Sequence, residues 1–316
     1  RHAYLLHLLG GLQCAVAVNK LDAIGYDRAR FDALEREGRA YRGDIGVTPA
    51  HVIPVSAREG DNIAAASPAM PWYRGPSVVA ALDEFVPAEP AVAQPLRLPI
   101  QDVYKFDTRR ILVGRIESGR LAVGDRLLFS PLNKSARIAS LEAWHVEPPP
   151  RAAEAGQSVG ITLDEPLFIE RGAMASHLDQ PPVETDVFRA RLFWLGREPL
   201  KVGARVKLKL ATIEATVTVQ SIERVIDTGD LSANLASQVE RNAVAEVVLR
   251  AGRMLALDSR AELPRTSRFV LVDGYDIAGG GLISMQGYAD QRELNTVRAT
   301  NVQKVEHRVS NNDRAR

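Results

Sequence analysis

The sequence predicts a short α/β segment followed by two all-β barrels. Helical and strand-like runs alternate up to residue 87, an order typical of an open α/β sheet. Beyond a Pro/Ala-rich stretch, apolar residues recur at every second position between Gly, Pro and Asp turns, as in small barrels. A chain of 316 residues that is 46% hydrophobic and 25% charged can bury cores of this kind.

The α/β segment is expected to contain helices at 3–9, 31–41 and 78–86 and strands at 14–18 and 51–55. Gly10 and Gly11 end the first helix as a C-cap signal. The run Cys14–Val18 is short, continuous and apolar, which is typical of a strand buried on both faces of a parallel sheet. Phe31 and Leu34 begin the helical spacing of the second helix.

Composition also predicts the domain limits. We expect the α/β part at 1–87, a linker at 88–95, a first barrel at 96–180, a second barrel at 184–284 and a polar tail at 285–316. In the stretch 205–210 (RVKLKL), valine and leucine alternate with charged residues, so one face is expected to pack on a core. Gly279–Gly281 is expected to form a turn or bulge between barrel strands.

Charge and cysteine content argue against several classes of protein. Lys and Arg number 40 against 39 Asp and Glu, a net charge of +1, so neither nucleic acid nor a membrane surface is the expected partner. The single cysteine, Cys14, cannot close an internal disulfide, and a cytoplasmic location is expected. The six histidines lack metal-ligand spacing, so neither a metal ligand nor a catalytic residue is predicted within this sequence.

The strongest chemical signal is Asn19-Lys20-Leu21-Asp22, directly after the first predicted strand. Open α/β sheets bind ligands beyond the carboxyl ends of their strands. An Asp22 carboxylate can accept from both N1–H and the 2-amine of guanine, whereas adenine has no donor at either position. The Asn19 amide can bond the N7/O6 side, and the Lys20 stem can lie on the base. The alternative is an ordinary loop in which Asn and Asp make turn hydrogen bonds.

A second loop supports the guanine hypothesis. Ser56-Ala57-Arg58 follows the second predicted strand, so both loops are expected at the same edge of the sheet. In GTP-binding proteins a loop of this kind offers the Ala backbone N–H to guanine O6, and the Ser side chain braces it. Arg58 stands where Lys or Leu is commoner. The predicted guanine-binding residues are therefore Asn19, Lys20, Asp22, Ser56, Ala57 and Arg58.

With Asn19–Asp22 and the segment 55–62 (VSAREGDN), the chain resembles the translation-factor type of GTPase. The segments 70–76 (MPWYRGP), 193–200 (FWLGREPL), 241–247 (RNAVAEV) and 114–119 (GRIESG) narrow the resemblance to the GTPase subunit of bacterial sulfate adenylyltransferase. The tail at 307–316 is similar to the junction with a fused adenylylsulfate kinase domain. The fold implied is the C-terminal part of a P-loop GTPase sheet followed by two barrels of elongation-factor type.

The resemblance implies a function for the whole protein. The subunit would couple GTP hydrolysis to formation of adenylylsulfate from ATP and sulfate, with GTP and Mg²⁺ as cofactors and the catalytic small subunit as partner. The sequence departs from the family pattern, because it contains no G-x-x-x-x-G-K-[ST] phosphate loop and no Asp-x-x-Gly before Asn19. It begins with Arg1, and we expect a fragment that does not itself hydrolyse GTP, with the Mg²⁺ ligands in a missing N-terminal part.

Two other functions stay open at this point. The same domain order serves a translation elongation factor that delivers aminoacyl-tRNA, although a basic stripe is not evident. A non-enzymatic scaffold built from barrels is also compatible with a sequence that lacks the phosphate loop. The aromatic pairs Trp72-Tyr73 and Phe193-Trp194 are equally consistent with partner contacts and with core packing.

Overall fold

The computed structural model describes residues 13–44, 47–87, 91–106, 109–143, 146–226, 233–234, 236–285 and 288–292. The helix predicted at 3–9 lies outside these residues. The α/β part contains, in chain order, β1 (Ala15–Val18), the 3₁₀ helix η1 (Leu21–Ile24), α2 (Arg28–Asp44), β2 (His51–Pro54) and α3 (Val78–Asp83). No helix among the described residues is both long and apolar enough to cross a membrane.

Strands β1 and β2 run parallel, as predicted, with Val16 opposite Val52 and Val18 opposite Pro54. Strand β2 is largely buried, but β1 is mostly half-buried and Ala17 is exposed, so the prediction that β1 is buried on both faces is wrong. The reason is that β1 pairs only with β2 among the described residues. Cys14, just before β1, is half-buried and free.

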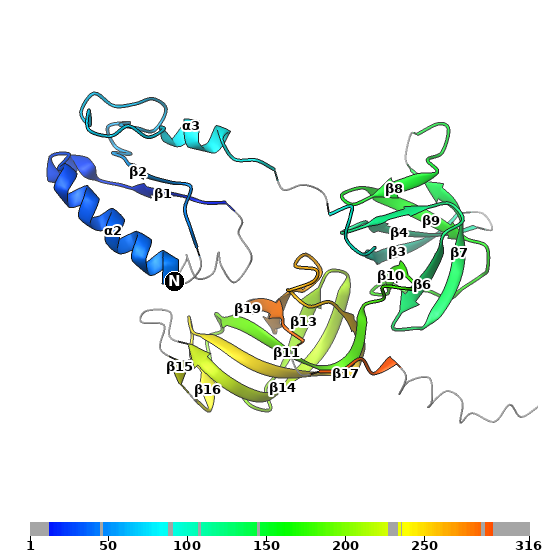
Figure 1. Ribbon diagram of the computed structural model, residues 1–316. Coiled ribbons are helices and arrows are strands. Elements are labelled where there is room, and N and C mark those ends of the chain that lie inside the picture. Colours follow the sequence, from blue (N-terminus) through cyan, green and yellow to red (C-terminus); the bar gives the residue numbers. More distant parts are fainter. Residues whose placement is uncertain are drawn as a thin grey trace, which may run out of the picture.

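Helix α2 lies alongside this small sheet (Figure 1). Its Phe31 is buried with Leu21, Val52 and Met70, whereas Leu34 is exposed. Helix α3 begins at an N-cap, where the Ser77 hydroxyl accepts from Ala80 N at 3.3 Å. It ends at Asp83, before the predicted Val86.

The first barrel follows and is closed, in the strand order β10-β3-β4-β9-β7-β6 (Figure 1). Its strands are β3 (Leu98–Phe106), β4 (Arg109–Arg115), β6 (Arg126–Ser130), β7 (Lys134–Glu142), β9 (Ser158–Leu163) and β10 (Met174–His177), with a small added sheet of β5 (Arg120–Ala122) and β8 (Ala152–Glu154). Alternate residues face inward, and Leu98, Ile100, Leu127, Phe129 and Ile161 are completely buried.

The second barrel is ordered β13-β18-β19-β11-β17-β14, and pairing of β13 with β14 closes the ring. Its strands are β11 (Val183–Trp194), β13 (Arg205–Leu210), β14 (Ile213–Ile226), β17 (Val244–Leu257), β18 (Arg268–Asp273) and β19 (Asp276–Ile283), with the short strands β12 (Leu200–Lys201), β15 (Ala233–Asn234) and β16 (Gln238–Val239). The alternation predicted at 205–210 is confirmed, because Val206, Leu208 and Leu210 are buried in the core.

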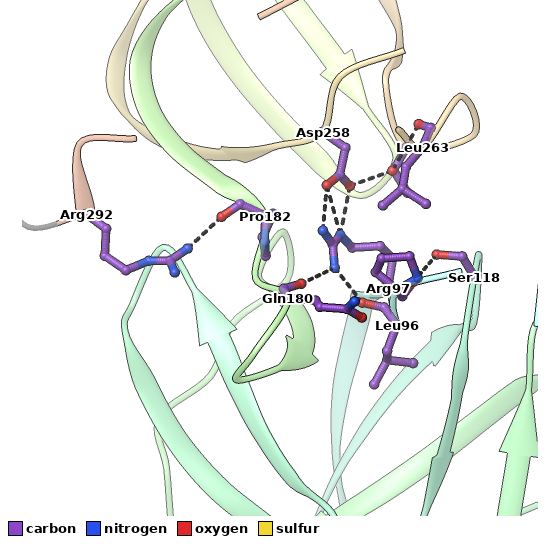
Figure 2. A network of polar contacts seen from close by, with 10 residues as sticks. Leu96, Arg97, Ser118, Gln180, Pro182, Asp258, Leu263 and Arg292 are labelled. Carbon is purple, nitrogen blue, oxygen red and sulfur yellow. Dashed lines mark hydrogen bonds and ion pairs between the residues drawn. The ribbon is translucent and has the colours of Figure 1, made fainter. Parts of the chain in front are cut away.

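The two barrels are joined by a buried ion pair between Arg97, just before β3, and Asp258, just after β17 (Figure 2). Arg97 Nε donates to both carboxylate oxygens at 2.9 Å, and Nη2 lies 2.8 Å from Oδ1. Nη1 donates to the carbonyl oxygens of Leu96 and Gln180, both at 2.8 Å, and Thr266 Oγ1 donates to Asp258 Oδ2 at 2.6 Å. These bonds satisfy a charge pair whose side chains are only 5% and 2% exposed.

A second contact joins the barrels at Glu184, which is completely buried. Asn133, in the turn between β6 and β7, donates through Nδ2 to Glu184 Oε2 at 2.9 Å. Arg292 Nε lies 3.2 Å from Oε1 of the same carboxylate, and Arg292 Nη2 donates to Pro182 O at 2.6 Å (Figure 2). The chain after the second barrel therefore returns to the junction between the barrels.

The structure places the triple glycine inside a strand and distinguishes between the two roles considered for the aromatic pairs. Gly279–Gly281 lies inside β19 between β11 and β18 rather than in a turn, and the shift of the β18–β19 register beside Gly279 agrees with the alternative prediction of a bulge. A Cβ at Gly279 would lie 2.7 Å from Phe193 O, so glycine permits a close approach of the strands. Phe193 and Trp194 are buried, and Trp72 packs on Phe31 with ring centroids 5.4 Å apart, which indicates core packing.

Candidate guanine-binding site

The two predicted guanine loops lie side by side at the carboxyl ends of β1 and β2. Val55 N donates to Val18 O at 2.9 Å, and Leu21 N donates to Val55 O at 3.2 Å. These bonds continue the parallel pairing of β1 and β2 beyond the last strand residues. Parallel pairing therefore places the segment after Val18 beside the segment after Val55, as the order of the elements predicts.

Asp22 and Ser56 form the direct link between the loops. The Ser56 hydroxyl donates to Asp22 Oδ1 at 2.8 Å, and Ser56 itself is completely buried. Oδ2 of Asp22 has no hydrogen-bond partner within the described part of the chain. Asp22 is half-buried, so the bond to Ser56 fixes the carboxylate while an acceptor oxygen stays available for a ligand.

Asn19 makes the second link. Its Oδ1 accepts from Lys20 N at 2.7 Å and from Ala57 N at 3.0 Å. The amide oxygen is thus used within the protein, which turns the Nδ2 group into the ligand-facing donor. The Ala57 N–H, expected to point at guanine O6, is shared with Asn19 in this structure, so a bound base would compete for it or share it.

Lys20 and Arg58 are exposed at the rim of the site. Lys20 has φ 70° and ψ 34°, a left-handed conformation that starts η1 and turns the chain sharply after β1. The Arg58 side chain is 85% exposed, and its Nε lies 3.3 Å from Glu59 Oε1. Both side chains are long and mobile enough to cover a planar ligand, but neither is held in place by a buried partner.

The donors and acceptors of the two loops suit guanine. Asp22 supplies a carboxylate for two adjacent N–H donors, and Asn19 supplies an amide donor for the opposite edge of the base. All six predicted residues thus occupy the same pair of loops. Their roles toward the base stay predictions, since the contacts described here are contacts within the protein.

Three residues behind these loops were given no role in the sequence analysis. Tyr26 Oη donates to Asp61 Oδ2 at 2.6 Å, and Asn62, which is buried, donates through Nδ2 to Pro54 O at 2.9 Å. Asp61 and Asn62 lie within the 55–62 segment of the resemblance, which was the available signal for them. Nothing in the local sequence around Tyr26 indicates its contact with a residue 35 positions away.

Metal-binding side chains do not gather near the loops. Within the described ranges, no group of three or more His, Cys, Asp and Glu residues could hold a metal ion. Cavities lie on the barrels: one of about 820 Å³ beside His177 and one of about 610 Å³ beside Tyr104 on the first barrel, and one of about 450 Å³ beside Arg191 on the second.

A parallel α/β part with Asn-Lys-x-Asp and Ser-Ala loops at its strand ends, followed by two barrels, is the architecture of a translation-factor GTPase. The second barrel matches the family model "GTP-eEF1A C-terminal domain-like" over residues 187–284. Elongation factor 1-alpha of Pyrococcus abyssi is 34% identical over 301 residues, covering 90% of this chain and 70% of the relative. Elongation factor 1-alpha of Thermoplasma volcanium is 31% identical over 294 residues, with 90% and 69% covered.

Solved structures agree on the fold. The crystal structure of sup35 complexed with GDP superposes with a TM-score of 0.58 at 21% identity, covering 90% of this chain and 72% of that one. The sup35 complex with GMPPNP gives a TM-score of 0.57 at 20% identity, covering 90% and 71%. The chain belongs to the translation-factor GTPase superfamily and is similar to elongation factor 1-alpha.

Proposed function

We propose that the intact protein is a GTP-dependent switch. Residues 19–22 and 56–58 recognise the guanine base of the bound nucleotide. The observation that carries the proposal is the link between Asp22 and Ser56, which fixes one carboxylate oxygen and leaves the other for guanine. Sup35, which shares the fold, has been crystallised in complex with GDP and with GMPPNP, and this supports a guanine nucleotide as ligand. Mg²⁺ would accompany GTP through its phosphates, but no described residue is assigned to it.

The barrel pair is the proposed partner-binding body. Arg97 and Asp258 hold the two barrels together, so a movement of the nucleotide-binding part would shift them as a unit. Nucleotide-dependent loops change shape when the γ-phosphate is lost, and a rigid body presents a different surface to the partner in each state.

Two classes of partner are supported by different observations. The relatives are named elongation factor 1-alpha, which favours translation elongation, with aminoacyl-tRNA as the partner. The segments 70–76 and 193–200 favour the GTPase subunit of a cytoplasmic sulfate adenylyltransferase, with the small catalytic subunit and a fused adenylylsulfate kinase domain as partners.

The charge distribution of the second barrel bears on this choice. Arginines on β11, β14 and β17 are paired with carboxylates: Arg189 with Glu223, Arg191 and Arg224 with Glu246, and Arg250 with Asp186. Unpaired Lys and Arg side chains that neutralise phosphates release counterions from the nucleic acid, which favours binding. Arginines already paired with carboxylates contribute less to such binding. This face therefore favours a protein partner over tRNA.

Nucleotide binding tests the switch itself. The intact protein should bind GDP in preference to ADP by about 100-fold or more, because each hydrogen bond to a charged carboxylate contributes about 1.5–3 kcal/mol. Competition binding with labelled GDP measures the ratio. Equal affinity for GDP and ADP would contradict the proposal.

A second experiment separates the partners. The intact protein, loaded with GTP, is mixed in parallel with the small adenylyltransferase subunit and with aminoacyl-tRNA from the same organism. Co-purification with the small subunit and GTP-dependent stimulation of adenylylsulfate formation would support sulfate activation. Retention of aminoacyl-tRNA with no change in sulfate activation would support elongation and overturn the sulfate proposal.

A further inference from the structure

A polar contact behind the site ties the two guanine loops together. Tyr26 Oη donates to Asp61 Oδ2 at 2.6 Å, and Ser67 Oγ donates to Asp61 Oδ1 at 2.6 Å, so both oxygens of the carboxylate are used. Asp61 closes the turn that starts at Ser56, because Asp61 N donates to Ser56 O at 3.1 Å and Ser56 N donates to Asp61 O at 3.3 Å. The contact thus joins the end of one loop to the base of the other.

The backbone at Tyr26 is held in an unusual conformation. Gly25 and Tyr26 are both left-handed, with φ 62° and 58°, and such a conformation is uncommon for a bulky residue. Tyr26 N donates to Leu21 O at 2.8 Å, and Trp72 Nε1 donates to Tyr26 O at 3.1 Å. Hydrogen bonds at both its backbone N–H and its carbonyl oxygen therefore hold Tyr26 in this conformation. A strained backbone persists only where the surrounding structure maintains it, and such residues gather at functional sites.

The protonation states suit a strong bond. The hydrogen bond to Asp61, followed by desolvation and the nearby carboxylates, raises the pKa of Tyr26 to about 12. Hydrogen bonds from Ser67 and Tyr26 hold the pKa of Asp61 below its ordinary value. At neutral pH the phenol is a donor and the carboxylate a charged acceptor, and such charge-assisted bonds are roughly twice as strong as neutral ones.

We propose that Tyr26 and Asp61 are positioning residues for guanine recognition. They hold the segment carrying Asn19 and Asp22 at a fixed separation from the turn carrying Ala57, so that both loops address the same base without rearrangement. A site that is already in its bound geometry loses less free energy to ordering on binding. The inference rests on the proposed guanine site and adds two residues that do not touch the nucleotide.

The test uses the intact protein with GDP as the probe. Tyr26→Phe removes only the hydroxyl, and we expect GDP affinity to fall about tenfold, the loss of one hydrogen bond to a charged group. The preference for GDP over ADP should be retained, because Asp22 is unchanged. Tyr73→Phe is the matched control: its hydroxyl donates to Pro76 O at 3.1 Å in the same small core but touches neither loop. This control should bind GDP like the wild type.

A double-mutant cycle separates positioning from general loosening. Asp61→Ala removes the acceptor of the Tyr26 hydroxyl and should weaken GDP binding, and adding Tyr26→Phe to it should cause little further loss, because the contact is already absent. The proposal is overturned if Tyr26→Phe binds GDP like the wild type, if Tyr73→Phe weakens binding equally, or if the two losses simply add. In those cases a wild-type preference for GDP over ADP leaves the proposed function standing, whereas equal affinity for both overturns the function and the inference together.

Discussion

The α/β part and the barrel pair are held together in different ways. Each barrel is closed around a large apolar core and joined to its neighbour by buried charges with full hydrogen bonding. The α/β part has small cores, one built on Leu21, Phe31, Val52 and Met70, and its loops are positioned by side-chain hydrogen bonds such as Ser56 to Asp22. The barrels owe their geometry mainly to packing, and the loops to polar contacts.

Because of this difference, we expect substitutions in the barrels to affect mainly stability and substitutions in the loops to affect mainly ligand affinity. Removing a buried group from the barrel pair should change stability, because cores and buried ion pairs do not relax easily. Removing an accessible polar group from the loops, such as exposed Asn19 or half-buried Asp22, should change ligand affinity more than stability, because water can replace the lost contact; buried Ser56 is the exception.

The largest expected effect on stability is at the junction of the barrels. Asp258→Ala leaves the Arg97 guanidinium buried without its partner, which should cost about 3–5 kcal/mol of unfolding free energy. Urea unfolding followed by circular dichroism measures the loss. Asp276→Ala is the matched control, because its ion pair with Arg197 is 3.8 Å long with side chains 88% and 78% exposed. The control should lose less than about 1 kcal/mol, and equal losses would show that the junction is no stronger than a surface pair.

A smaller effect is expected on the outer face of the second barrel. Desolvation opposes ionisation of Glu246, but hydrogen bonds from Arg191 and Arg224 outweigh it and hold the pKa of Glu246 below its ordinary value. Its stabilisation is therefore present above the pKa of the unfolded chain, about 4.3, and is lost as the pH falls through the lower folded pKa.

Glu246→Gln should accordingly cost about 1 kcal/mol at pH 7. Below about pH 4 its unfolding midpoint should converge with that of the wild type. A difference that stays constant down to pH 2.5 would show that the ion pairs with Arg191 and Arg224 are not its cause.

The sequence was informative where one periodic pattern determines one structure. The alternation at 205–210 places Val206 and Leu208 in the barrel core, and two strand ends in a parallel sheet bring Asp22 and Ser56 within hydrogen-bonding distance. The sequence was not informative where the contact is long-range and side-chain specific. Arg97 and Asp258 lie 161 positions apart, and each alone has the pattern of an ordinary charged residue in a turn.

Neither the exposure of β1 nor the position of Gly279–Gly281 inside a strand could be predicted from the local sequence. An apolar run predicts a buried strand, but burial depends on which strands pair beside it. A run of glycines is consistent with a turn, and also with a strand that its neighbours approach too closely for a side chain, as at Gly279. Both outcomes depend on tertiary packing that leaves no local pattern.

Asp22→Asn in the intact protein tests whether Asp22 is the carboxylate that recognises guanine. The amide oxygen of the new side chain can still accept from Ser56 Oγ, so the loop link is preserved. Its NH₂ group would then face the guanine 2-amine, donor against donor, whereas xanthine carries a carbonyl oxygen there. GTP binding should fall by about 100-fold, and competition binding should show that the variant prefers xanthosine triphosphate to GTP. A variant that still prefers GTP would contradict the guanine assignment.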